Sequence, residues 1–193
     1  MSPTKVIQNN LLPSPSGSSP ELAGILIPED QLRTRIRELA VDLNQTYQQE
    51  SVVVIGVLKG AILFFSDLIR ELQFPVEVDF LGISSYGGGT ESGEAVVNRA
   101  LTTTLSNRNV IIVDDILDGG QTLGKVVELV RAEQPKSMAT CVLLERTDRR
   151  AHDITADYVG FRIPDAFVIG YGLDYAERFR NLPFIGVLNQ THS

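Results

Sequence analysis

The sequence contains no tryptophan and a single cysteine, and its 17 lysines and arginines are outnumbered by 24 aspartates and glutamates. The single cysteine, Cys141, excludes a disulfide within the chain, and its place in the apolar run MATCVLL indicates a buried thiol rather than a nucleophile. The formal net charge of −7 argues against nucleic-acid binding. It does not argue against a polyphosphate ligand, because backbone N–H groups, a few local cations and bridging magnesium can hold phosphate inside an acidic protein.

Long apolar runs are also missing. No run is long enough to span a bilayer, and the N-terminus has neither the basic region nor the apolar core of a secretory signal. We therefore expect a cytoplasmic protein that does not contact membranes. The chain of 193 residues, with 43% hydrophobic and 21% charged residues, suffices for one globular domain with a hydrophobic core.

The N-terminal residues differ in composition from the rest of the chain. Residues 1–20 contain four prolines and the run SPSGSSP. Such a stretch buries too little apolar surface to offset its ordering entropy. We therefore predict a flexible tail over residues 1–20 and a single domain over residues 21–193.

Beyond this segment, apolar strands alternate with amphipathic helices. The β-branched, apolar runs at 51–58 and 109–113 are typical of buried parallel strands. A helix is predicted after Pro28 and another over 61–72, the latter with a buried face formed by Ile62, Phe65, Ile69 and Leu72. Further strands are predicted at 76–86, 137–144, 157–161, 167–172 and 184–188. The alternation predicts an α/β domain with a mainly parallel, twisted sheet flanked by helices.

Polar segments follow several of the predicted strands. They occupy residues 58–60, 114–122, 145–150 and 173–180. Ligands of such sheets bind beyond the carboxyl ends of the strands. We therefore expect these segments to lie on one rim of the domain.

The most informative stretch is VIIVDDILDGGQTL at 110–123. Asp114 and Asp115 follow a strand, where their carboxylates can face the hydroxyls of a sugar or a metal ion. Gly119 and Gly120 allow a tight turn that exposes N–H groups at the start of the next helix, which suits a phosphate monoester. Thr122 adds a hydroxyl donor and a candidate helix cap. The alternative is an acidic turn with an ordinary cap; no G-x-x-x-x-G-K-[ST] or G-x-G-x-x-G motif is present.

DDILDGGQT resembles the motif with which type I phosphoribosyltransferases bind PRPP (5-phosphoribosyl 1-pyrophosphate). Over residues 22–190 the chain is most similar to the hypoxanthine-guanine phosphoribosyltransferases, because VLKG (57–60), VDF…SSYGGG (78–89) and RIPDAFVIGYGLDYAERFRNLP (162–183) also match in order and spacing. The resemblance implies the type I phosphoribosyltransferase fold with a small hood region. It also implies a purine salvage enzyme that uses magnesium (Mg2+) to join PRPP and a 6-oxopurine into IMP or GMP, as a homodimer or homotetramer.

The resemblance assigns roles by position. Asp118 would act beside ring nitrogen N7 of the purine, accepting or sharing a proton while N9 attacks the anomeric carbon. Leu58, Lys59 and Gly60 would form the pyrophosphate loop, in which a non-proline cis peptide turns an N–H toward the pyrophosphate. The residues expected to bind PRPP and its phosphates are Lys59, Gly60, Asp114, Asp115, Asp118, Gly119, Gly120, Gln121, Thr122 and Arg180, and the expected magnesium ligands are Asp114, Asp115 and Asp174.

The purine site is implied in the same way. Phe167 would stack on the base, the backbone of Val168 would bind its edge, and Arg146 would donate to its 6-oxo group. The full expected set is Ile116, Arg146, Phe167, Val168 and Asp174. Ser85 and Tyr86 would lie at the tip of a mobile loop that closes over the site and excludes water.

Three residues depart from the family pattern. Asp114 stands where glutamate is usual, and Gly119 replaces a threonine or serine. Losing one hydroxyl bond to phosphate costs about 0.5–1.5 kcal/mol, so weaker PRPP binding is expected. Arg146 replaces a lysine and is planar and longer. We expect the 6-oxopurine preference to persist, with the choice among hypoxanthine, guanine and xanthine open.

Two other functions are compatible with the motifs. A PRPP- or nucleotide-sensing regulator of the same fold would need a basic face for nucleic acid, which the acidic composition disfavours. A transferase for xanthine or a pyrimidine would keep the PRPP site and change the base. Phe167, Val168 and the cationic Arg146 favour a purine with an exocyclic oxygen.

Overall fold

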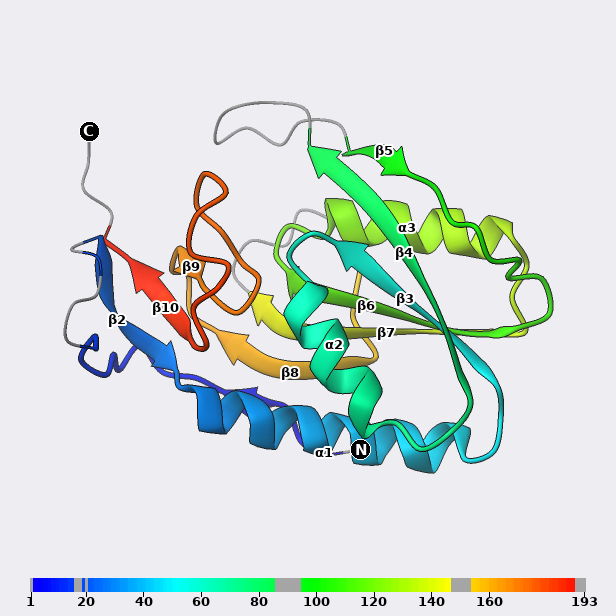
Figure 1. Cartoon of the computed structure of the whole chain (residues 1–193), viewed down its shortest axis with the longest axis horizontal. Coiled ribbons are helices and arrows are strands. Elements are labelled where there is room, and N and C mark those ends of the chain that lie inside the picture. The colour runs from blue at the N-terminus through cyan, green and yellow to red at the C-terminus, as the bar shows by residue number, and fades with distance from the viewer. Residues whose placement is uncertain (1, 16–18, 20, 86–94, 147–153, 190–193) are drawn as a thin grey trace.

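The computed structural model of the chain describes residues 2–15, 19, 21–85, 95–146 and 154–189 (Figure 1). Its strands form two sheets. The larger sheet contains, in spatial order, β1 (Lys5–Val6), β8 (Tyr158–Ile163), β7 (Ser137–Arg146), β6 (Asn109–Leu117), β3 (Val52–Leu58), β4 (Val76–Ser85) and β5 (Ala95–Arg99). The smaller sheet contains β2 (Leu22–Ile27), β10 (Ile185–Leu188) and β9 (Val168–Ile169), and we call it the hood.

Neighbouring strands of the larger sheet are parallel, except that β4 and β5 are antiparallel. The predicted α/β domain with a mainly parallel sheet is therefore confirmed. The runs at 167–172 and 184–188 belong instead to the antiparallel hood, where β10 pairs with β2 on one side and with β9 on the other. The first of these strands is short because Gly170, Tyr171 and Gly172 all have positive φ angles, which turn the chain away from the sheet.

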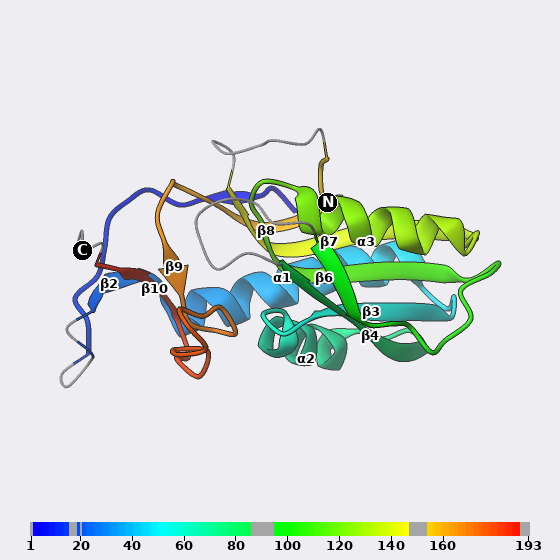
Figure 2. The same ribbon diagram turned by 90° about the horizontal axis from the view of Figure 1, so that it is seen from above.

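Helices cover both faces of the larger sheet. α1 (Glu29–Tyr47) and α2 (Ile62–Glu71) lie on one face, and α3 (Gln121–Ala132) lies on the other (Figures 1 and 2). Pro28 precedes α1 as its N-cap, close to the predicted start. None of the helices in these described ranges is both long and apolar enough to cross a membrane.

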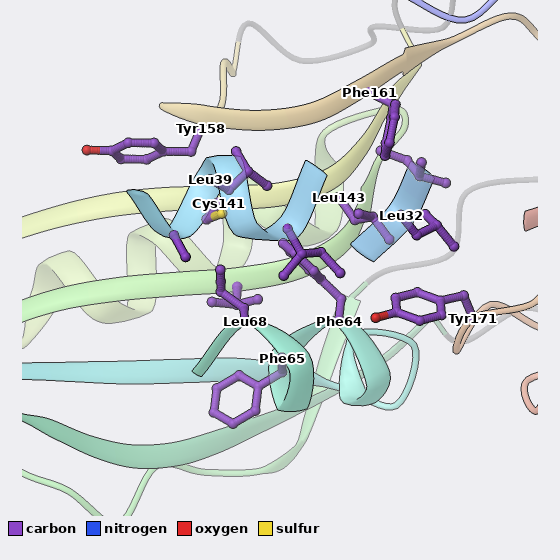
Figure 3. Packing of buried hydrophobic residues seen from close by; sticks show 14 of the residues in the cluster. Leu32, Leu39, Phe64, Phe65, Leu68, Cys141, Leu143, Tyr158, Phe161 and Tyr171 are labelled. Atoms are coloured by element: carbon purple, nitrogen blue, oxygen red, sulfur yellow. The ribbon is translucent and has the colours of Figure 1, made fainter. Parts of the chain in front are cut away.

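The core that joins α1 and α2 to the sheet buries aromatic and aliphatic side chains from both helices and from strands of both sheets (Figure 3). Leu32 and Leu39 of α1, and Cys141 and Leu143 of β7, belong to this cluster together with Phe64 and Leu68 of α2. Cys141 is fully buried, and this burial raises the pKa of its thiol to about 12. The prediction of a buried, structural thiol is confirmed.

The predicted buried face of α2 is partly wrong. Phe64, Phe65 and Leu68 are buried, whereas Ile62 is 40% exposed. The run ILFF places an apolar residue at every position of the first turn, so periodicity alone does not identify the buried side. Packing against α1 selects Phe64 and Leu68 (Figure 3).

The described part of residues 1–20 lies against the domain. β1 extends the larger sheet beyond β8, and Leu12 bridges to Ile25 of the hood. The backbone N–H of Ser2 donates to Asp42 of α1 at 2.7 Å. This arrangement differs from the loose tail suggested by the composition, because backbone hydrogen bonds to a sheet edge do not require apolar side chains.

Candidate active site

Three segments meet where β3, β6 and β7 end. Residues 58–60 follow β3, residues 118–120 join β6 to α3, and residues 170–182 project from the hood. A Cβ atom placed on Gly60 would lie 1.8 Å from Oδ2 of Asp115, and one placed on Gly172 would lie 2.0 Å from the carbonyl oxygen of Gly60. The backbones thus approach as closely as glycine allows. The Leu58–Lys59 peptide bond is cis, as the resemblance implies.

The acidic pair lies within the last part of β6, which runs to Leu117 and is longer than the predicted strand. Asp114 is buried, and its carboxylate accepts the backbone N–H of Asp115 at 2.9 Å. Burial and the negative charge of Asp115 raise the pKa of Asp114 well above its usual value. Burial also raises the pKa of Asp115, although the positive charge of Arg180 opposes this. The pair is therefore a concentration of poorly compensated negative charge.

Replacing Asp114 with asparagine should stabilise the ligand-free protein by about 0.5–2 kcal/mol at pH 8, as measured by urea unfolding. A carboxyl whose folded pKa is raised contributes stability below its unfolded pKa, and this contribution is lost as the pH rises through the folded pKa. Asparagine has no charged form, so it does not lose this stability at high pH. The gain in unfolding free energy from the substitution should therefore shrink as the pH is lowered. Glu128→Gln, at a carboxylate that is 73% exposed on α3, is the control and should change little. A gain that is independent of pH would contradict the assignment.

Asp118 and Arg146 form an ion pair at the end of the sheet. Nη1 of Arg146 donates to Oδ2 of Asp118 at 2.7 Å, and Nη2 donates to the carbonyl oxygen of Ala166 at 2.6 Å. Within the described ranges, two buried side-chain atoms have no hydrogen-bond partner, and they are Oδ1 of Asp118 and Nε of Arg146. One acceptor and one donor of this ion pair therefore make no hydrogen bond, and Oδ1 of Asp165 lies 4.0 Å from the donor, beyond hydrogen-bond distance.

The turn before α3 has the expected geometry. Gly120 is the N-cap with a φ of 86°, and no side chain caps the helix. Thr122, a candidate cap from the sequence, lies inside the first turn with Gln121, so that prediction is wrong. The N–H groups of the first turn and the positive end of the helix dipole are directed beyond Gly119 and Gly120, where an anion is favoured.

The hood contributes a network of charges. Arg180 donates to the carbonyl oxygen of Gly172 at 2.8 Å and pairs with Asp174 at 2.8 Å. Glu177 pairs with Arg180 at 3.2 Å and with Lys59 at 3.0 Å. No sequence signal marks Glu177 as a site residue, because its partner Lys59 is 118 positions away and no motif links the two.

The aromatic residue expected to stack on a base is accessible. Phe167 is 41% exposed, and its ring meets that of Tyr175 edge-on, with centroids 5.7 Å apart. Pattern alone would make Phe167 a core residue of an apolar strand. Val168, next to it, is buried in β9, and Ile116 packs against the core at the end of β6.

Part of the expected site lies outside the described residues. Tyr86 and the glycines at 87–89 belong to that part, as does the side chain of Ser85, whose backbone ends β4. In the ranges that are described, no group of three or more histidine, cysteine, aspartate or glutamate side chains is placed to hold a metal ion.

Comparison with known proteins adds to this geometry. A family model described as phosphoribosyl transferase domain matches residues 28–176. The chain is 46% identical over 169 residues to a hypoxanthine-guanine phosphoribosyltransferase of Bacillus subtilis, covering 87% of this chain and 94% of that protein.

Solved structures agree with the sequence match. A hypoxanthine phosphoribosyltransferase from Staphylococcus aureus is 43% identical, with a TM-score of 0.83, and the match covers 87% of this chain and 92% of that one. The hypoxanthine phosphoribosyl transferase of Trypanosoma cruzi, a structure concerned with the role of its C-terminal region in oligomeric state and activity, is 37% identical with a TM-score of 0.83. That match covers 89% of this chain and 93% of the other.

Proposed function

This chain belongs to the phosphoribosyltransferase family, and we propose that it is a purine salvage enzyme that transfers the 5-phosphoribosyl group of PRPP to a 6-oxopurine, releasing pyrophosphate. The observation that carries the choice of base is the pair of unpartnered atoms on Asp118 and Arg146. Oδ1 of Asp118 accepts a hydrogen bond, and Nε of Arg146 donates one. A 6-oxopurine presents the complementary N7–H donor and O6 acceptor side by side, so one ligand satisfies both atoms.

PRPP fits the three segments that meet at the rim. The first turn of α3 and the loop from Asp118 to Thr122 would bind the 5′-phosphate through backbone N–H groups. Asp114 and Asp115 would bind the ribose hydroxyls. Lys59, the backbone of Gly60, and Arg180 would bind the pyrophosphate. The three groups of residues would thus bind PRPP in order along the molecule, from the 5′-phosphate through the ribose to the pyrophosphate on the anomeric carbon.

Asp118 would accept the proton of the base. Its Oδ2 is held by Arg146, which fixes the carboxylate, while Oδ1 is free to accept the proton at N7 as N9 attacks the anomeric carbon. The C–N bond forms as the bond to the pyrophosphate oxygen breaks, and pyrophosphate leaves with the bonding electrons. Phe167, exposed at the rim, would hold the plane of the purine by stacking.

The acidic pair fits magnesium. Mg2+ prefers carboxylate oxygens and is commonly held by one or two carboxylates together with substrate phosphates, so a cluster of three protein ligands is not required. Burial raises the pKa of Asp114 and that of Asp115, with the charge of Asp115 adding to the shift of Asp114, and a bound divalent cation would favour the charged forms. Asp174 would hold a second ion. When bound, magnesium supplies charge neutralisation of the pyrophosphate.

An assay with magnesium, PRPP and one base at a time tests the proposal. We expect nucleotide from hypoxanthine, guanine or both. Adenine should be disfavoured on the order of 10⁴-fold, because its 6-amino group would leave the donor on Arg146 unpaired. Absence of nucleotide from hypoxanthine, guanine, xanthine, adenine and uracil alike would refute the enzyme and favour a sensor. Turnover of adenine alone would refute the role of Arg146.

The assembly and location of the enzyme remain predictions. We propose a homodimer or homotetramer, as the resemblance implies, and the structure of the Trypanosoma cruzi relative was concerned with oligomeric state. A cytoplasmic location is expected from the sequence. Light scattering of the purified protein would give the number of subunits.

A further inference from the structure

The carboxylate of Glu177 joins the two cations assigned to pyrophosphate. Its Oε1 lies 3.0 Å from Nζ of Lys59, and its Oε2 lies 3.2 Å from Nη2 of Arg180. The positive charges of Lys59 and Arg180 lower the pKa of Glu177, so it is an anion at neutral pH. In the absence of ligand, the two cations therefore already share a negative partner.

The backbone around Glu177 holds it in this position. Ala176, Glu177 and Phe179 have φ angles of 51°, 62° and 74°, a left-handed conformation that non-glycine residues rarely adopt. The N–H of Glu177 donates to Oδ2 of Asp174 at 2.9 Å, and Tyr175 and Arg178 exchange backbone hydrogen bonds across the turn. Strained conformations of this kind persist where the surrounding structure over-determines them and are concentrated at functional sites.

Arg180 does not need Glu177 to keep its position. It is only 25% exposed, and its guanidinium also donates to the carbonyl oxygen of Gly172 and pairs with Asp174, both at 2.8 Å. Glu177 and Lys59, in contrast, are 65% and 68% exposed. Removal of the Glu177 charge would thus weaken the contact with Lys59 and both hydrogen bonds that Arg180 donates to Glu177, without releasing Arg180 from the site.

We propose that Glu177 is an internal counter-ion that takes the electrostatic place of pyrophosphate in the ligand-free enzyme and so weakens the binding of PRPP and of the pyrophosphate product. This inference rests on the proposed function, because it takes Lys59 and Arg180 as the pyrophosphate-binding cations. To bind Lys59 and Arg180, pyrophosphate must displace Glu177 from both ion pairs. When these ion pairs form again, they favour release of the pyrophosphate product. Glu177 is a positioning residue that tunes affinity and does not touch the reacting atoms.

Titration calorimetry with inorganic pyrophosphate and magnesium tests the inference on the full-length protein. Since exposed ion pairs are individually weak, Glu177→Gln should lower the Kd for pyrophosphate only about threefold to tenfold. Glu128→Gln removes the same charge from α3 and should leave the Kd unchanged. The difference between Glu177→Gln and wild type should shrink at high salt, which a purely structural effect would not do. In the forward reaction, KM for PRPP should fall in the same variant.

Several outcomes would overturn the inference. The first is a Kd for pyrophosphate that is unchanged or higher in Glu177→Gln. The second is an equal decrease of the Kd in Glu128→Gln. The third is the absence of pyrophosphate binding by the wild type and both variants. The base assay separates this failure from that of the proposed function. Nucleotide formation by the wild type with an unchanged Kd in the variant refutes the counter-ion alone. Tighter pyrophosphate binding by the variant without nucleotide from any base refutes the transferase alone.

Discussion

Asp118→Asn should lower kcat about 100-fold to 10,000-fold with hypoxanthine or guanine, while KM for PRPP changes little. Asparagine has nearly the same shape and can still accept a hydrogen bond from Arg146, but it cannot take a proton from N7. The loss should therefore appear in turnover rather than in PRPP binding. Steady-state kinetics at saturating base and varied PRPP measure both quantities.

Asp165→Asn is the matched control for this variant. Oδ1 of Asp165 lies 4.0 Å from Nε of Arg146, so this carboxylate faces the same guanidinium from another side. It should affect kcat by less than about tenfold, because it is not placed to accept the proton of the base. Wild-type turnover in Asp118→Asn, or an equal loss in both variants, would contradict the role of Asp118. Thermal unfolding of both variants would show whether loss of the partly buried ion pair also destabilises the fold.

Gly172→Ala should lower kcat/KM for PRPP by about 100-fold, since a shift of about 1 Å in a binding group has effects of that size. The new Cβ would lie 2.0 Å from the carbonyl oxygen of Gly60, and Gly172 has a φ of 101°, which a residue with a Cβ adopts only with strain. The hood segment and the loop after β3 must then separate. Lys59 is next to Gly60 and Arg180 donates to the carbonyl oxygen of Gly172, so this separation would move the two cations apart.

Gly124→Ala provides the control for the glycine substitution. Gly124 lies within α3, and no atom lies within 4 Å of a Cβ placed there. Alanine should stabilise that helix by about 1 kcal/mol and leave kcat/KM unchanged. Urea unfolding and PRPP kinetics on both variants separate an effect on the site from an effect on stability. Wild-type kcat/KM in Gly172→Ala would show that the contact with Gly60 does not position the site.

Much of the fold could be predicted because it depends on local pattern. The runs at 51–58 and 109–113 are apolar on both faces, as strands covered on both sides must be, and they became β3 and β6. The two glycines after Asp118 indicate a tight turn, and Gly120 does adopt the left-handed conformation that favours glycine. These properties depend on neighbouring residues and on their hydrophobicity, both of which can be taken directly from the sequence.

Other local patterns were ambiguous, and tertiary packing decided them. The buried face of α2 could not be chosen from the run ILFF, and contact with α1 selected Phe64 and Leu68. The sequence patterns of β2 and β5 are too weak to predict these strands. They form by pairing with β10 and β4, respectively. Residues 1–20 have the composition of a tail, yet their described part binds a free sheet edge through backbone atoms.

The class of the fold, the acidic pair, the glycine turn and the family resemblance could all be predicted, because each depends on residues that are neighbours in the sequence. Which charges meet depends on the tertiary structure. It placed Arg146 on Asp118 and left one acceptor and one donor open, and it joined Lys59 to Glu177 across 118 positions. Such pairs have no local periodicity or spacing, since an ion pair depends on distance in space, and that distance is set by how β3, β6, β7 and the hood pack together.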